Sequence, residues 1–424
     1  MKLRLLLVTG IASFILSCKS PQTLNRTSIP PNSATITQLL QQHPQHFQQI
    51  LSKPGEFRVQ IIYTQIDRKK NNRPVFTDHY FNVDPAMYFY PASTVKMPTA
   101  LFALERIKEL ADKGITRNSS MITEAAYSGQ SPVYNDPTAP DGRPTVEHYI
   151  KKIFLVSDND AYNRLYEFVG QERINKRLQE MGYTNSSILH RLEIFLSEDE
   201  NRHTNPVRFY DDTTKLLYEQ PMQFNQQPYP VRKDSLGRGY YSGGKLINGP
   251  MDFSKKNKVT LPDLHLMLRS ILFPREVKKK HRFKIADEDY EFLWQYMAMY
   301  PQEAGSPPYD TSYHDAYCKF LYWGSEKGTL PKNMRIFNKI GDAYGFLTDV
   351  AYVVDFENNI EFMVSATIYC NTDGILNDSK YDYDTIGFPF MKQLGRVLYE
   401  HELRRARKNK PDLSQYQFKF AGNQ

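Results

Sequence analysis

Residues 334–369 read MRIFNKIGDAYGFLTDVAYVVDFENNIEFMVSATIY and carry the clearest secondary-structure signal in the chain. Apolar, β-branched and aromatic residues form runs at 334–340, 348–355 and 360–369, and the polar residues 357–359 supply a turn between the last two runs. Runs of this kind, bounded by turn residues, are typical of antiparallel strands. We therefore expect the last third of the chain to contribute three strands to a sheet.

Two further strands are predicted near the start of the chain. Residues 57–63 alternate between apolar and polar side chains, residues 67–73 form a turn, and residues 75–83 supply a partner strand. Helical patterns follow at 94–110 and 146–182. This order predicts an α+β fold, with an antiparallel sheet of about five strands built from both chain ends, flanked by helices, and an inserted, mostly helical subdomain.

The remaining segments complete the expected organisation. Helices are predicted at 33–53, 259–272 and 287–299, and around the apolar stripe of Phe390, Met391, Leu394, Val397 and Leu398. Two loop insertions are predicted near 205–258, which is rich in Pro, Gly, Gln and Tyr, and near 305–332. The expected domain order is a signal peptide at 1–17, a polar tether at 18–34, one folded domain at 35–408 and a polar tail at 409–424.

Composition and charge restrict the class of protein. The chain has 424 residues, of which 40% are hydrophobic and 24% are charged, a balance typical of a globular protein with a substantial core. Its formal net charge of +7 is small for this length, so no nucleic-acid partner is expected. We expect a monomer.

The N-terminus has the order of an export signal. Lys2 and Arg4 precede an apolar run at 5–16, which is too short to span a bilayer, and Ser17 and Cys18 follow. The sequence Ile-Leu-Ser-Cys at 15–18 resembles a bacterial lipobox, in which the cysteine is lipidated after cleavage. We therefore expect a membrane-anchored lipoprotein of the bacterial cell envelope, on a periplasmic or outer-membrane face. The alternative is an ordinary signal cut near Ser17 with a soluble product.

Two cysteines remain after Cys18. Cys318 and Cys370 either form one disulfide in the oxidising envelope or remain two separate buried thiols.

Ser93 and Lys96 are the first candidate catalytic pair. They open a helical pattern at i and i+3, so the hydroxyl and the amine lie on one helix face, where an unprotonated Lys can activate a Ser. Ser242 and Lys245 show the same spacing in a Gly-rich loop. The alternative for any such pair is a structural role, in which the Ser caps the helix N-terminus and the Lys is solvated.

Two further motifs follow in the chain. Ser157-Asp158-Asn159 interrupts a helical segment with a polar trio, and Lys339-Ile340-Gly341 ends a predicted strand. S-x-x-K, S-D-N and K-T-G occur in this order in class A β-lactamases and penicillin-binding proteins. The chain resembles a class A serine β-lactamase, and the similarity covers roughly residues 55–408 apart from the loop-rich stretches. Residues 189–197, which contain Glu193, look like the E-x-x-L-N loop of that family, with Ser197 in place of Asn.

The resemblance implies a role for each of these residues. Ser93 would be the nucleophile, Lys96 its proton-transfer partner and Ser157 a relay to the leaving nitrogen, while Glu193 would activate the deacylating water. The resemblance also implies substrate-binding roles. Asn159 would bind the side-chain amide of the substrate, and Lys339 and Gly341 would bind its carboxylate. The backbone N–H of Asp342 would form an oxyanion hole with that of Ser93. The implied substrate is a β-lactam or a peptidoglycan-like amide, and the implied physiological role is antibiotic resistance.

Ile340 departs from the family pattern. A Thr hydroxyl at this place would hydrogen-bond the substrate carboxylate, so we expect weakened or redirected recognition of β-lactams. Three rival functions remain. The first is a D-alanyl-D-alanine carboxypeptidase or penicillin-binding protein, and the second is a class D β-lactamase, which residues 91–98 also resemble. The third is a non-catalytic binder of peptidoglycan or β-lactams. No metal site or cofactor is expected, because no His or Cys spacing fits a zinc site.

Overall fold

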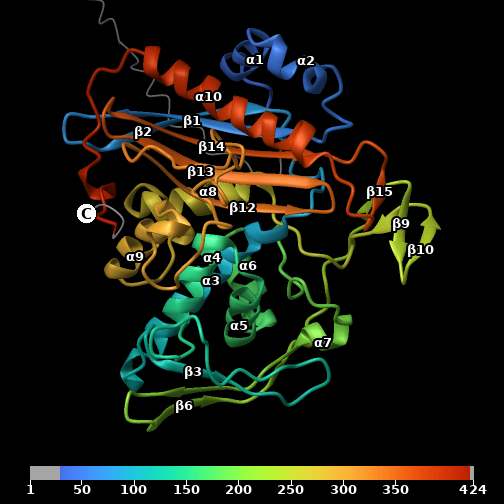
Figure 1. Ribbon diagram of the computed structural model, residues 1–424, viewed down its shortest axis with the longest axis vertical. Helices are drawn as coiled ribbons and strands as arrows, with labels where there is room; N and C mark the ends of the chain where they lie inside the picture. The colour runs from blue at the N-terminus through green and yellow to red at the C-terminus, as the bar shows by residue number, and fades with distance from the viewer. Residues whose placement is uncertain (1–28, 421–424) are drawn as a thin grey trace, which may run out of the picture.

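A five-stranded antiparallel sheet forms the centre of the computed structural model, which describes residues 29–420 (Figure 1). The strands lie in the order β12-β13-β14-β1-β2, so strands from the end of the chain pair with strands from its start. Their bounds are β1 Gln60–Arg68, β2 Pro74–Phe81, β12 Met334–Ala343, β13 Phe346–Asp355 and β14 Ile360–Tyr369. The predicted α+β fold with a sheet built from both chain ends is confirmed.

The hairpin between β12 and β13 has longer strands and a shorter turn than the sequence pattern indicates. β12 continues past Ile340 to Ala343, which pairs with Phe346, so only Tyr344 and Gly345 form the turn. Both turn residues have positive φ, 51° and 80°, as expected for a two-residue hairpin that follows the twist of its strands. β12 is the outer strand of the sheet, and its residues are buried as far as Gly341.

One face of the sheet is covered by helices from both chain ends (Figure 1). α10 Phe388–Arg404 lies across the sheet, with α1 Ala34–Gln41 and α2 Pro44–Ser52 beside it. The prediction of a single helix at 33–53 is wrong. Proline lacks the N–H that an interior position needs, so Pro44 begins a second helix at its first position.

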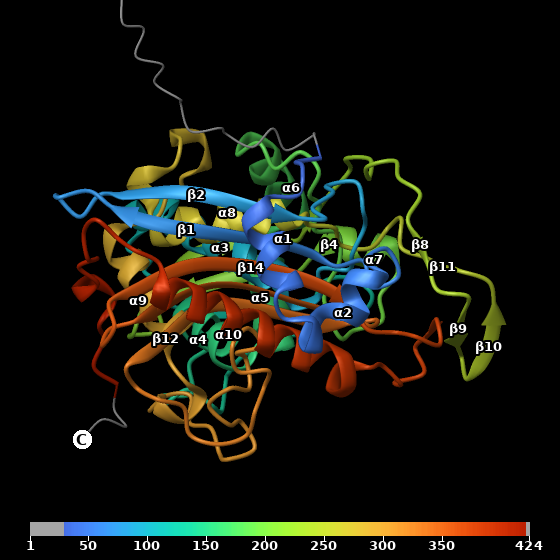
Figure 2. The ribbon, with the colours of Figure 1, turned by 90° about the horizontal axis from the view of Figure 1, so that it is seen from above.

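The other face carries the helical subdomain (Figures 1 and 2). α8 packs directly on β13 and β14, and α9 packs on α8 and β12. The helices of this subdomain are α3 Lys96–Glu109, α4 Val146–Val156, α5 Asn159–Val169, α6 Gln171–Glu180, α8 Leu261–Leu272 and α9 Asp287–Ala298. The S-D-N trio, expected inside a helical segment, instead forms the junction between α4 and α5.

The insertion 205–258 is more ordered than a loop. Its strands form small sheets with one another and with neighbouring segments, and the β9–β10 hairpin projects from the side of the molecule (Figure 2). The strands within the insertion are β5 Val207–Tyr210, β6 Leu216–Gln220, β7 Gln223–Phe224, β8 Ser235–Leu236, β9 Gly239–Ser242, β10 Lys245–Asn248 and β11 Met251–Asp252. The neighbouring short elements are β3 Ser120–Thr123, α7 Glu198–Arg202, β4 His203–Thr204 and β15 Ile375–Leu376. Residues 305–332 contain turns and bends without helix or strand, as predicted.

The C-terminal segment belongs to the folded domain and is not a polar tail. Tyr416 is fully buried, and its hydroxyl donates to the carbonyl of Leu272 at 2.8 Å. Its ring packs edge-on against Phe337 and Tyr352, so the last described residues close the core beneath the sheet.

The cysteines and the leader complete the comparison with the sequence. Cys318 and Cys370 are both free and buried, which matches the alternative of two separate thiols. The predicted signal peptide and Cys18 lie outside the described residues. Across residues 29–420, no helix is long and apolar enough to cross a membrane.

Candidate active site

Ser93 lies in the turn that begins the first long helix of the subdomain. The 3₁₀ turn Ala92–Val95 leads directly into α3, so Ser93 stands one turn before the helix interior and Lys96 is the first α3 residue. Ser93 is half-buried, whereas Lys96 is fully buried. Ser93 and Lys96 therefore flank the start of α3, about one helical turn apart along the chain.

Gly341 allows the sheet edge to approach this turn. A Cβ atom at position 341 would lie 2.7 Å from the carbonyl oxygen of Pro91 and 2.9 Å from the backbone nitrogen of Ser93, closer than real side chains come. Only glycine therefore permits this contact between β12 and the turn. As a result, the backbone N–H of Ser93 lies beside the strand that carries Lys339 and Asp342.

Lys96 is surrounded by oxygen atoms from the junction between α4 and α5. Its Nζ donates to the carbonyl oxygen of Ser157, lies 3.3 Å from Ser157 Oγ and donates to Asn159 Oδ1 at 2.6 Å. Burial, reinforced by the nearby Lys339 ammonium, holds the pKa of Lys96 well below its ordinary value and favours the neutral amine. Among residues 29–420, no side chain or backbone group is hydrogen-bonded to the hydroxyl of Ser93.

Ser157 lies between two lysines because of its unusual backbone. It ends α4 in the left-handed conformation, with φ 59°, and Asp158 then caps α5 by accepting from the backbone N–H of Ala161 at 2.7 Å. The sharp junction brings Ser157 Oγ within 2.8 Å of Lys339 Nζ on β12. Burial lowers the pKa of Lys339 to about 8. Positive φ at a non-glycine residue is costly, and such strain is characteristic of functional sites.

Glu193 lines the same cleft but is held quite differently. The base of its loop is fixed, because Arg191 donates to buried Glu167 at 2.7 Å and the Asn163 side chain bonds the N–H and carbonyl of Leu192, each at 2.9 Å. Glu193 itself is exposed, has φ 54° and forms no hydrogen bond or ion pair with any residue of the 29–420 segment.

Ser197 does not substitute for the family asparagine in this loop. Its hydroxyl accepts from the backbone N–H of Glu200 at 3.2 Å and thereby caps α7, with no contact to Glu193. The candidate deacylating carboxylate therefore lines the same cleft as the candidate nucleophile, without hydrogen bonds to residues 29–420 that would orient a general base.

A cleft of about 1090 Å³ connects the predicted residues. Ser93, Ser157, Asn159, Glu193 and Asp342 all line it, and Lys96, Lys339 and Gly341 lie directly behind them. The cleft is also lined by residues that the sequence analysis missed, among them Tyr90, His190, Lys256, His314, Lys327, Tyr344 and Tyr381. They come mostly from the insertions and turns, where an isolated charge or ring gives no sequence signal.

Ile340, which departs from the motif expected at this place, has largely apolar surroundings. Ile340 is only 4% exposed and belongs to the same apolar cluster as Cys318 and Phe320 of the 305–332 insertion. Buried polar contacts attach this insertion to the sheet: the Asn338 side chain donates to the carbonyl of Cys318 at 2.9 Å, and Asp349 accepts from the N–H of Leu321 at 2.9 Å. The insertion is therefore joined to the strand that carries Ile340, and Ile340 and Phe320 both line the cleft.

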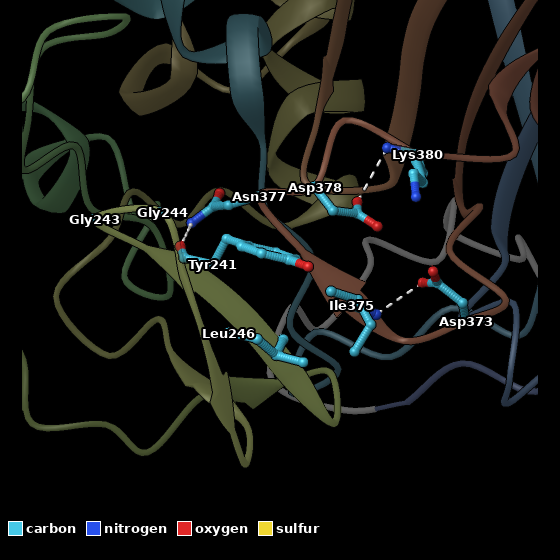
Figure 3. Close-up of a pocket in the computed structure, with 9 residues that line it drawn as sticks. All are labelled: Tyr241, Gly243, Gly244, Leu246, Asp373, Ile375, Asn377, Asp378 and Lys380. Atoms are coloured by element: carbon cyan, nitrogen blue, oxygen red, sulfur yellow. Dashed lines mark hydrogen bonds between the residues drawn. The ribbon is translucent and has the colours of Figure 1, made fainter.

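The second S-x-x-K sequence lies at a separate, shallower depression of about 660 Å³ (Figure 3). Ser242 and Lys245 are paired across the β9–β10 hairpin, with Gly243 and Gly244 as its turn, so they do not share a helix face. Asn377, whose side chain donates to the carbonyl of Tyr241 at 3.1 Å, lines both this depression and the larger cleft. The geometry therefore distinguishes Ser93 from Ser242.

Comparison with known proteins gives one family and several similar folds. The model of the Beta-lactamase enzyme family matches residues 44–287, a range that contains Ser93, Lys96, Ser157 and Glu193 and ends before Lys339. No curated protein matches the sequence.

Solved structures with a similar fold have low sequence identity to this chain. PBP-A has a TM-score of 0.47 and 16% identity over 88% of this chain and 98% of its own. A beta-lactamase from Burkholderia phymatum has a TM-score of 0.46 and 14% identity over 87% of this chain and 100% of its own. A class A beta-lactamase from Clostridium kluyveri has a TM-score of 0.44 and 15% identity over 85% of this chain and 98% of its own.

Proposed function

Because the chain belongs to the Beta-lactamase enzyme family, we propose that it is a serine hydrolase that opens β-lactam rings through an acyl-enzyme on Ser93. The observation that carries this proposal is the environment of Lys96. A fully buried amine, bonded to Ser157 and Asn159 and one turn from a serine that lines a cleft, is the arrangement required to activate a hydroxyl.

Acylation follows from the order of the side chains. Ser93 Oγ attacks the lactam carbonyl while its proton passes to the neutral Lys96 amine. The proton then moves through the Ser157 hydroxyl, which lies between Lys96 and Lys339, to the leaving nitrogen as the C–N bond breaks. The backbone N–H groups of Ser93 and Asp342 stabilise the oxyanion that forms in between.

Substrate binding uses the two sides of this centre. Lys339 supplies positive charge for the carboxylate beside the leaving nitrogen. The Oδ1 atom of Asn159 is occupied by Lys96, which leaves its Nδ2 group to donate to the carbonyl of the acyl side chain.

Deacylation is assigned to Glu193, which would take a proton from the water that attacks the ester. Its exposed, unpaired position favours a second candidate, a penicillin-binding protein or D-alanyl-D-alanine carboxypeptidase. In that case acylation would proceed by the same route and β-lactam hydrolysis would be slow, because no oriented base activates water.

Nitrocefin and a D-Ala-D-Ala peptide separate these functions when each is compared with a Ser93→Ala variant. Rapid nitrocefin hydrolysis that Ser93→Ala abolishes is the expected result. A stable adduct of Ser93 with nitrocefin, together with release of D-alanine from the peptide, would support the second candidate. Absence of nitrocefin hydrolysis, of D-alanine release and of any adduct by intact mass would contradict both and leave a non-catalytic binder.

The envelope location is a separate proposal that rests on the leader. We propose that lipidated Cys18 anchors the protein, so that Cys18→Ser yields an exported protein that no longer sediments with membranes. Membrane fractionation without detergent tests this. Tight association of the variant with membranes would show that another segment is the anchor.

A further inference from the structure

Lys256, in the 205–258 insertion, lines the catalytic cleft with an unpaired ammonium group. Its side chain is half-buried and forms no hydrogen bond or ion pair with any of the residues from 29 to 420. The adjacent Lys255, by contrast, forms an ion pair with Glu198 at 2.7 Å. An unpaired charge that is partly removed from water attracts a counter-ion, so the contrast between these neighbours points to a ligand.

The backbone around Lys256 is fixed. The Arg232 guanidinium, itself paired with Asp234 at 2.9 Å, donates to the carbonyl of Lys256. On the other side, the side chain of buried Asn257 accepts from the N–H groups of Leu189 and His190 at 2.7 and 3.1 Å. The insertion is thus attached to the Glu193 loop, and the position of Lys256 at the cleft is set by the fold.

Lys256 lies beside the turn that follows β12, whereas Lys339 lies within that strand. The Nζ atom of Lys256 stands 5.8 Å from the ring centroid of Tyr344, the first turn residue after β12. At about 3.3 Å per residue along a strand, Tyr344 is about 16 Å from Lys339, and Gly341, which touches the Ser93 turn, lies between them. Since Lys339 marks the side of the leaving nitrogen in the proposed function, Lys256 is on the acyl side.

Aromatic rings enclose this end of the cleft. Tyr90 packs edge-on against Tyr344 at 4.9 Å and parallel to His190 at 6.1 Å. Burial, together with the charge of Lys256, lowers the pKa of His190 to about 4, so its imidazole is neutral at pH 7. Glu193 and Asp342 line the same cleft, but neither forms an ion pair with Lys256 within the described segment.

We propose that Lys256 binds a carboxylate on the acyl side chain of the substrate, so that the preferred substrates carry one anionic group on each side of the reacting amide. This inference rests on the proposed function of the same cleft and adds the class of substrate. It assigns to the 205–258 insertion a role in specificity.

Benzylpenicillin and carbenicillin provide a matched pair of probes, because they differ by one carboxylate on the acyl side chain. The measurement is the second-order rate constant for acylation of the full protein by each compound. It is taken as kcat/KM where the compound is hydrolysed, and as the rate of adduct formation by intact mass where the adduct persists. In Lys256→Met, the ratio of the carbenicillin constant to the benzylpenicillin constant should fall by about 10-fold or more relative to the parent. Lys256→Arg should restore most of that ratio, and Lys255→Met should keep the parent ratio.

Each other outcome contradicts the inference or the function on which it rests. An unchanged ratio of the two acylation constants in Lys256→Met, or an equal fall of both constants, would show that Lys256 does not bind the acyl carboxylate. If neither penicillin acylates the parent, the proposed function is wrong. The role of Lys256 can then still be decided from binding. The dissociation constants of the two penicillins are measured with Ser93→Ala and with Ser93→Ala/Lys256→Met, and their ratio is compared between the two variants.

Discussion

Lys96 and Glu193, the two candidate bases of the cleft, occupy opposite kinds of environment. Lys96 is fully buried and donates to oxygen atoms from a junction between two helices, whereas Glu193 is exposed on a loop and forms no hydrogen bond or ion pair with residues 29–420. A general base contributes most when its position and protonation state are fixed before the reaction. In the proposed mechanism, the base for acylation is therefore held in place more thoroughly than the base for deacylation.

The strongest test of this contrast removes the buried base. Lys96→Met keeps the length and apolar stem of the side chain but cannot accept the proton of Ser93, so acylation by benzylpenicillin should slow by about 10³- to 10⁴-fold. Intact mass at successive times measures the adduct. Thermal unfolding of the same variant serves as the control for folding. Acylation at the parental rate would transfer the role of base to Glu193 and reverse the comparison.

Replacement of the exposed carboxylate should act on the other half of the reaction. Glu193→Gln retains the shape of the side chain but cannot accept a proton from water, so release of the penicilloyl group should slow by about 10²-fold while acylation persists. The decay of the adduct after removal of free penicillin is the measurement. If the parent already retains the adduct and the variant behaves alike, Glu193 has no catalytic role and the protein is a penicillin-binding protein.

A smaller effect is expected where the sheet edge meets the Ser93 turn. The new Cβ of Gly341→Ala would lie 2.9 Å from the Ser93 nitrogen, so the strand and the turn must separate, and acylation should slow by about 10- to 100-fold. Gly305→Ala is the matched control, because a Cβ there meets no atom within 4 Å. Equal rates for Gly341→Ala and the parent would show that this close approach does not orient the nucleophile.

The smallest effect concerns the protonation state of Lys339. Because burial lowers its pKa to about 8, the ammonium that attracts the substrate carboxylate is lost as the pH rises through that value. The value of kcat/KM should therefore decline severalfold between about pH 7 and pH 9. In Lys339→Arg, whose guanidinium stays protonated, the decline should move to higher pH, and an identical profile would exclude Lys339 as the titrating group.

The sequence predicts the parts of the fold that depend on periodicity and motif order. The strands at the two chain ends and the pairing of Ser93 with Lys96 follow from local spacing, and the order of the motifs distinguishes Ser93 from Ser242. Features that arise from long-range packing were not predictable. The exposure of Glu193 depends on how its loop is anchored, and the place of Lys256 in the cleft depends on how the insertion folds back.

Two helices predicted as continuous are divided in the structure, and in each case a nearby residue causes the break. Pro44 divides the first predicted helix, and the polar side chains of Ser157 and Asp158 end one helix and cap the next. Both breaks have signals in the sequence, a proline and a capping residue, which the apolar periodicity of the flanking segments obscures.

The pairing of β1 with β14 also affects how the molecule matures. Gln60 lies opposite Thr367, so the central sheet closes a loop that spans most of the chain. Contacts of such high order form late in folding. Lys339 and Gly341 reach the Ser93 turn only as part of this sheet. The cleft that Ser93 lines is therefore complete only when residues from both ends of the described segment have folded together.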